Sequence, residues 1–280
     1  MAPITHRSRI HLLAAKEAPT IVILQRKRAK LFHVVTVDTQ THQVTEGSWF
    51  RGVIYVLQCD VSFDGKYMAY LAMGKPGPDI WSGLCRLPWL KTLVEVEGVG
   101  RAWGGGYFPR QNVFVANGWW PDKIAQAVGT KIPFKISEGP FLYSRSGDHG
   151  LIYERWSRDG FKRLGPNWGE EETFDGPYRV VCTGDDGWGH QPSRQHPRLE
   201  VRYLGFIDSG ARYAFSLDEF PAVVEGASWA TWDYGGNLWV ARPGVVEKYT
   251  LKDLPRGTPS FSLDVDQFEP PSRASEAPAT

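Results

Sequence analysis

The sequence is poor in cysteine and methionine and carries almost no net charge. Three Cys and three Met occur in 280 residues, and no two cysteines form a C-x-x-C pair. An odd number of widely spaced cysteines argues against a disulfide framework and favours reduced, buried thiols, which are typical of a cytoplasmic protein. The 32 Lys and Arg against 31 Asp and Glu give a net charge of +1. Because nucleic-acid-binding proteins normally carry a basic excess, we expect no nucleic-acid partner.

Long hydrophobic runs are missing as well. No apolar stretch approaches the roughly 18 residues that a membrane-spanning helix needs. The apolar run near the N-terminus is too short for a signal peptide. We therefore expect a cytoplasmic protein with no membrane partner.

The motifs of several enzyme classes are absent. The sequence has no G-x-S-x-G elbow, no G-x-x-x-x-G-K-[ST] phosphate loop and no H-E-x-x-H. The glycines at 104–106 follow Trp103 and precede a predicted strand instead of a helix, so they do not form a dinucleotide fingerprint. A carboxylate pair of the glycosidase type and a lactonase-type metal site both stay open, because neither needs a contiguous motif.

Aromatic residues and turn formers are abundant. Aromatics make up 13% of the chain, with 12 Trp, 30 Gly and 20 Pro, a composition that favours many short strands over long helices. The clearest example is residues 227–250, in which alternating strands are separated by Gly235-Gly236 and Pro243-Gly244. These turns predict a three-stranded antiparallel meander, the unit of propeller blades. We expect Trp229, Trp232 and Tyr234 to pack between blades.

Similar strand–turn–strand units recur along the chain. They are predicted over residues 20–37, 59–74, 102–117, 140–156 and 199–215. Several of their turns lie about 40 residues apart, the size of a four-stranded blade. We predict an all-β chain whose residues 1–268 form a single β-propeller of five to six four-stranded antiparallel blades, with five slightly preferred. A strand from residues 10–24 or 260–268 would close the ring, and residues 269–280 would form a disordered tail.

Two sets of residues resemble known propellers. The unit from Ser62 to Tyr70, S-F-D-G-K-Y-M-A-Y, resembles the blade unit of WD40-like and TolB-like β-propellers. A broader likeness, to an uncharacterised family of bacterial propeller-like proteins, covers the first 120 residues. It is carried by residues 9–14, Trp49-Phe50-x-Gly52-x-Ile54-Tyr55, Cys59-Asp60-x-Ser62 and 103–106. The resemblance implies a bacterial, cytoplasmic propeller and brings no catalytic residues.

The most irregular stretch is residues 180–199. It gathers Asp185, Asp186, His190 and His196 within 12 residues. Carboxylates and imidazoles are ligands of Zn and Mn, so the four residues are a candidate site for a divalent metal. Their spacing matches no known ligand pattern, and a structured binding or packing loop explains the same residues. In that interpretation Trp188 and Arg194 are candidate binding residues.

Two further aromatic loops are candidate binding surfaces. Trp119 and Trp120 precede Asp122, and at most one of two adjacent Trp side chains can enter the core of an extended chain. The other is available to a partner, since Trp is enriched at interfaces, or packs between blades. Trp168 lies in an acidic loop, where a solvated turn is the alternative.

Two functions are compatible with these features. The first is a non-catalytic β-propeller scaffold that presents aromatic loops to a protein or peptide partner and needs no cofactor. The alternative is a metal-dependent hydrolase or lactonase-like enzyme with its site at the mouth of the channel. The sequence favours the scaffold and leaves open an enzyme or a small-molecule ligand.

Overall fold

The computed structural model describes residues 7–74, 80–97, 104–117, 132–138, 149–163, 172–174, 180–182, 187–190, 192–207 and 210–271, and the structural statements below refer to these residues. Most of them form short antiparallel strands, as the composition predicts. No described helix is long and apolar enough to cross a membrane.

The N-terminal half forms two sheets that share one bent strand. The first sheet has the order β1-β2-β3-β4, and β4 continues into the second sheet by pairing with β6. The elements are β1 (Arg9–Ala14), β2 (Thr20–Arg28), β3 (Leu31–Asp38), β4 (Val44–Ile54), the 3-10 helix η1 (Val56–Gln58), β5 (Asp60–Val61), β6 (Tyr67–Gly74), β7 (Trp81–Arg86) and β8 (Thr92–Glu97). The hairpins predicted over residues 20–37 and 59–74 are confirmed.

The middle of the chain contributes smaller sheets and one helix. Its elements are β9 (Gly106–Arg110), β10 (Val113–Ala116), β11 (Lys135–Glu138), α2 (His149–Arg158), β12 (Lys162–Arg163), β13 (Glu172–Phe174), β14 (Val180–Cys182), β15 (Gly187–His190), β16 (Leu199–Ile207) and β17 (Gly210–Leu217). β9 and β10 form the hairpin predicted over residues 102–117, and β16 and β17 the one predicted over 199–215. β11 pairs with β10 in parallel.

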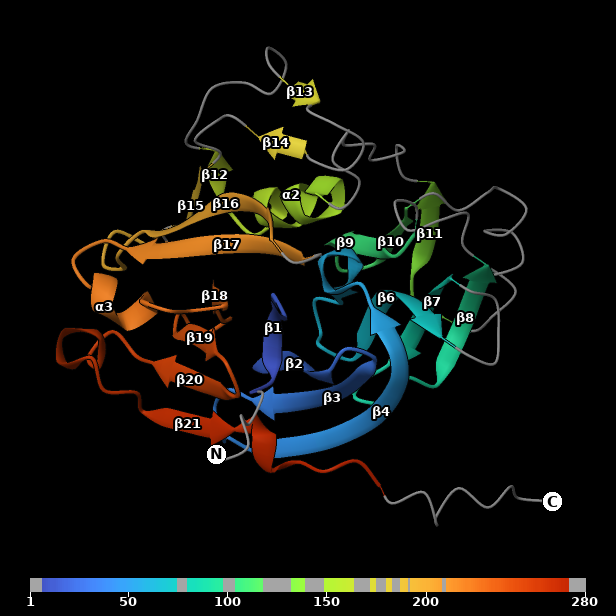
Figure 1. Cartoon of the computed structure of the whole chain (residues 1–280), viewed down its shortest axis with the longest axis horizontal. Coiled ribbons are helices and arrows are strands. Elements are labelled where there is room, and N and C mark those ends of the chain that lie inside the picture. Colours follow the sequence, from blue (N-terminus) through green and yellow to red (C-terminus); the bar gives the residue numbers. More distant parts are fainter. Residues whose placement is uncertain are drawn as a thin grey trace.

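The last sheet has the order β18-β19-β20-β21. Its elements are α3 (Pro221–Val224), β18 (Trp229–Trp232), β19 (Leu238–Arg242), β20 (Val245–Tyr249), η2 (Leu254–Arg256), β21 (Phe261–Asp264) and η3 (Val265–Gln267). The meander predicted over residues 227–250 is therefore confirmed. In Figure 1 the sheets follow one another around the middle of the molecule in chain order, with β1 near the centre.

One predicted strand is wrong. Residues 151–156 belong to α2, a ten-residue helix. Its buried positions are Leu151, Ile152, Arg155 and Trp156, and this spacing of one, three and one residues follows the 3.6-residue period of a helix instead of the two-residue alternation of a strand. Gly160, with a φ of +90°, follows the helix, and the Phe161 N–H bonds back to the Trp156 carbonyl, a common way for a helix to end.

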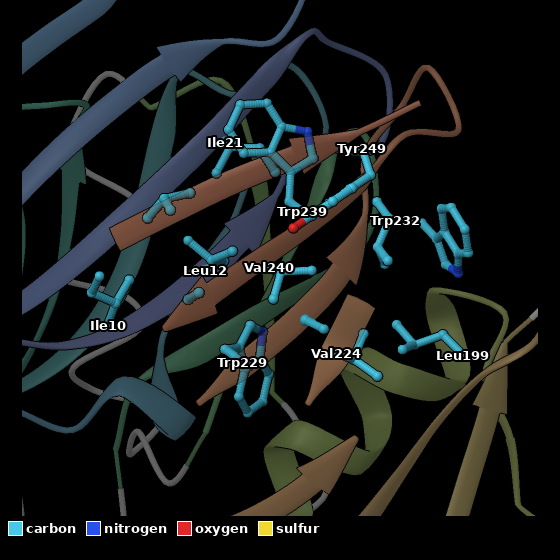
Figure 2. Packing of buried hydrophobic residues seen from close by; sticks show 14 of the residues in the cluster. Ile10, Leu12, Ile21, Leu199, Val224, Trp229, Trp232, Trp239, Val240 and Tyr249 are labelled. Carbon is cyan, nitrogen blue, oxygen red and sulfur yellow. The ribbon is translucent and has the colours of Figure 1, made fainter. Parts of the chain in front are cut away.

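The largest core cluster joins β1, β2 and β3 to α2 and to the last two sheets (Figure 2). Trp229 and Trp232 are buried, which confirms that they pack between sheets, and Trp239 is fully buried. Tyr234 is 56% exposed, so the prediction that it packs there is wrong. Tyr234 lies after the end of β18, within the turn closed by the hydrogen bond from the Gly236 N–H to the Asp233 carbonyl, and so it is not part of the strand that faces the core.

The first and last sheets meet through side chains. The Gln25 amide donates to the Val265 carbonyl at 2.9 Å, and Lys27 Nζ donates to the Asp266 carbonyl at 3.2 Å. Lys248 Nζ on β20 reaches the Thr39 carbonyl at 2.6 Å. Among the described strands, β1 pairs with β2 and β21 pairs with β20, so the first and last sheets are joined here by side chains and not by strand pairing. Buried hydrogen bonds thus hold the two ends of the chain together.

Two of the three cysteines are reduced. Cys59 and Cys85 are buried free thiols, as predicted. Burial raises the pKa of each to about 12, so neither is a reactive thiolate at neutral pH.

Candidate functional site

The middle of the molecule holds a buried ionic network centred on Asp60. Asp60 lies at the start of β5 with 1% of its side chain exposed. Arg155 and Arg158 are three residues apart on α2 and so lie on one face of the helix. Arg158 donates to both oxygens of Asp60, and Arg155 Nε lies 3.3 Å from Oδ1. The Phe108 N–H donates to Oδ2 at 2.8 Å.

The same arginines also bind main-chain carbonyls. Arg155 Nη1 donates to the Cys59 carbonyl at 2.6 Å, and Arg158 Nη1 donates to the Phe108 carbonyl at 2.9 Å. The helix is thereby joined to β9 and to the start of β5. Since buried charges are tolerated only when they are paired and hydrogen-bonded, this network fixes the position of α2 relative to β5 and β9.

The network continues to a second carboxylate and a third cation. Arg158 Nε donates to Asp159 Oδ1 at 2.8 Å, and Lys16 Nζ lies 3.5 Å from the same oxygen. Burial would raise the pKa of Asp159, but Arg158 and Lys16 outweigh it and hold this pKa below its usual value. Burial likewise opposes the charge of Arg158, but Asp159 and Asp60 raise its pKa overall. Both aspartates are therefore engaged by cations, and Asp159 stays ionised.

His190, a predicted metal ligand, lies beside this network at the end of β15. Its ring packs on Phe161 with 4.9 Å between centroids, and its Nε2 would be 3.1 Å from a Cβ at position 160, where the chain has glycine. Burial and the charge of Lys16 lower the pKa of His190 to about 4, against an opposing effect of Asp159. At neutral pH the imidazole is uncharged.

His196, the other predicted histidine ligand, holds the 192–198 segment against the last sheet. Its Nδ1 lies 2.7 Å from Ser193 Oγ, its Nε2 lies 3.0 Å from the Gly236 carbonyl, and its ring meets Trp232 edge-on at 5.2 Å. Both ring nitrogens have hydrogen-bond partners. A metal bound by His196 would have to displace one of them.

A groove of about 220 Å³ opens beside this histidine. It is lined by residues 194–198, 218–220, Leu251 and Leu254. Arg194, a predicted binding residue, is exposed here. Arg198 is held by Glu200 at 2.7 Å and by Asp218 at 3.5 Å.

Glu219 lines the groove with a backbone conformation that side chains rarely adopt. Its φ is +65°, in the left-handed region that costs a non-glycine residue roughly 1–2 kcal/mol. Such strain clusters at ligand-binding positions. Glu219 is therefore the feature that makes this groove a candidate binding surface.

Most of the other predicted site residues lie outside the described residues. These are Trp119, Trp120, Asp122, Trp168, Asp185 and Asp186. The backbone of Trp188 pairs with β16 opposite Val201. Within the described ranges no three His, Cys, Asp or Glu side chains are grouped as metal ligands would be. The four-residue metal site therefore stays a prediction.

Sequence reasoning missed the whole Asp60 network. Asp60 is part of the Cys59-Asp60-x-Ser62 element that carries the resemblance, but nothing local indicates its arginine partners, which are more than 90 residues away. Arg155 and Arg158 share a face only in a helix, so the strand predicted over 151–156 hid their pairing. If the segment is taken as a helix, the two arginines fall on one face, but their partner Asp60 is still not indicated.

Comparison with family models, curated proteins and solved structures gave no match for this chain.

Proposed function

We propose that the protein is a non-catalytic binding scaffold, in which a five-bladed β-propeller presents a groove beside Arg194 to a protein or peptide partner. The propeller is supported by the succession of antiparallel sheets around the middle of the molecule in Figure 1. We assign its blades to β1–β4, β5–β8, β9–β11, β15–β17 with β12, and β18–β21. The buried thiols Cys59 and Cys85 support a cytoplasmic location.

The observation that carries the proposal is the strained Glu219 in a groove with an exposed, cationic Arg194. The walls are held by the His196 hydrogen bonds and by the two carboxylates on Arg198. A groove with fixed walls and an exposed cation suits an extended peptide, because the groove loses little conformational freedom on binding. Phe220, a half-buried residue of the lining, would contact an apolar side chain of that peptide.

The Asp60 network supports a structural role for the middle of the molecule. A catalytic carboxylate needs an oxygen within reach of the substrate. Here the oxygens of Asp60 accept from Arg158 and from the Phe108 N–H. These buried charges thus attach α2 to β5 and β9.

Peptide display tests the proposal. Peptides are selected on the wild-type protein from a random library, and their affinities are measured by biolayer interferometry for wild type, Arg194→Glu and Lys30→Glu. Lys30 is exposed at the β2–β3 turn, away from the groove, and is the matched control. We expect peptides that lose at least tenfold in affinity with Arg194→Glu and keep it with Lys30→Glu. Selected peptides that bind both variants equally would refute the groove as the binding surface.

A second candidate function, a metal-dependent hydrolase or lactonase-like enzyme, is favoured by His190. The lowered pKa of its imidazole keeps it neutral at pH 7, the form that binds divalent metals. Zn²⁺ or Mn²⁺ would then raise the melting temperature of the wild-type protein and not of His190→Gln. Equal melting in chelator and in metal would count against the enzyme.

A further inference from the structure

A second groove lies between the first and second sheets. Its volume is about 460 Å³, within the range of small-molecule sites. Its lining consists of Thr20, Thr36, Gly65, Lys66, Tyr67, Arg86 and Leu87. It shares no residue with the groove beside Arg194, so it is a separate site.

The side chains that line this groove are cations and hydroxyls. Lys66 and Arg86 are exposed cations, two threonines add hydroxyl groups, and no carboxylate is part of the lining. The neighbouring Asp64 lies 3.7 Å from Lys66, but the two side chains are 48% and 73% exposed. An ion pair that exposed contributes little and is readily exchanged for another anion. The lining of the groove therefore carries two cations and no carboxylate, and Asp64 beside it is a weak competitor.

The Arg86 side chain is held in place by Tyr67 before any ligand binds. Arg86 Nη2 donates to the Tyr67 hydroxyl at 3.2 Å, and its guanidinium lies 5.5 Å from the centre of the Tyr67 ring. Tyr67 itself is buried. A guanidinium held in this way loses less conformational freedom when it binds an oxyanion, and its remaining N–H groups match the geometry of phosphate.

The turn that carries Lys66 is also held firmly. Gly65 has a φ of +69° and approaches β2 so closely that a Cβ there would meet Thr20 Oγ1 at 2.7 Å. The Leu87 N–H donates to the Lys66 carbonyl at 2.9 Å, which ties the end of β7 to this turn. The cations and hydroxyls thus come from four strands or turns that are fixed relative to one another.

We propose that this groove binds a phosphate group, with Arg86 and Lys66 as the charge partners and the hydroxyls of Thr20 and Thr36 as further donors. The volume leaves room for an organic portion beside the phosphate, so the ligand class is a phosphorylated small molecule or a phosphorylated side chain. Binding here is independent of the peptide groove, and its loss would leave the scaffold function unaffected.

Titration calorimetry with three probes tests this site: inorganic phosphate, O-phosphothreonine and a short phosphothreonine peptide. Four proteins are compared: wild type, the double variant Lys66→Met with Arg86→Met, Thr20→Val, and the control Lys30→Met. We expect wild type and Lys30→Met to bind at least one probe, with an affinity that falls as salt is added. The double variant should lose at least about tenfold, because charge-assisted hydrogen bonds are removed.

The variant Thr20→Val keeps the shape of the side chain and removes only its hydroxyl, so a few-fold loss of affinity with unchanged melting would separate recognition from folding. Binding of inorganic phosphate as tight as that of the phosphothreonine probes would identify a site for the free anion, and tighter binding of the peptide would identify a phosphorylated side chain. Either result supports a phosphate site. Failure of all three probes to bind wild type, or undiminished binding to the double variant, would overturn the proposal.

Discussion

Replacing Asp60 with asparagine should be among the most destabilising single changes in this chain. The substitution keeps the shape of the side chain but removes its charge. Arg155 and Arg158 have only 6% and 9% of their side chains exposed, so Arg155 would stay buried without the carboxylate that it is paired with, and Arg158 would keep only Asp159. The asparagine would also turn an NH₂ group toward a guanidinium or toward the Phe108 N–H, where Asp60 now accepts.

The size of the loss follows from the burial of the network. Removing one partner of a buried ion pair costs about 3–5 kcal/mol. Because two arginines depend on Asp60, we expect the upper part of this range, which is a large share of the roughly 5–15 kcal/mol that stabilises a typical domain. The loss should depend little on salt, since buried pairs are poorly screened.

Urea denaturation followed by tryptophan fluorescence measures this loss. The matched control is Asp218→Asn, because Asp218 is 49% exposed and its ion pair with Arg198 spans 3.5 Å. We expect the control to change the free energy of unfolding by less than about 1 kcal/mol. The double variant Asp60→Asn with Arg158→Met should lose less free energy of unfolding than the sum of the losses of the two single variants, by at least about 1 kcal/mol.

A loss below about 1 kcal/mol for Asp60→Asn, or strict additivity in the double variant, would refute the network as the element that holds α2. A loss that disappears in 1 M NaCl would do the same, because it would place the ions in contact with solvent.

Three further predictions follow from the backbone and the histidines. First, burial lowers the pKa values of His33 and His190 to about 4, so between pH 6.5 and 4 the unfolded chain binds more protons than the folded chain. The free energy of unfolding should therefore fall as the pH decreases across this window. Urea titrations at pH 7, 5.5 and 4.5 measure it, and a flat profile would contradict the prediction. Second, Glu219→Gly should raise the free energy of unfolding by about 0.5–1 kcal/mol, because glycine adopts the φ of +65° without strain. Unchanged or lower stability in the same assay would argue against strain at this position. Third, Gly65→Ala should lower the free energy of unfolding by about 2 kcal/mol or more, and Gly226→Ala by about 1 kcal/mol. Both glycines have positive φ, but only Gly65 faces a close neighbour, Thr20. Equal melting temperatures of the two variants would show that Thr20 moves aside at no cost.

The tight turns were readable from the sequence because their chemistry is local. Asp64-Gly65 and Gly235-Gly236 predict hairpins, and Gly65 and Gly236 indeed have φ values of +69° and +74°. Glycine adopts such values without steric cost, so the choice of residue and the turn are decided within four residues. The alternation that flanks each turn then identifies the strands.

The tertiary structure decided what the apolar and charged residues between these turns do. Residues 151–156 are too short an apolar run for sequence to separate a strand from a helix, and contacts of Leu151, Ile152 and Trp156 with distant strands select the helix. That choice aligns Arg155 and Arg158 on Asp60, a partner more than 90 residues earlier in the chain. The sequence likewise singled out His190, His196 and Arg194 as candidates. It could not give their surroundings, because Lys16 and Gly236 come near His190 and His196 only when separate sheets pack side by side.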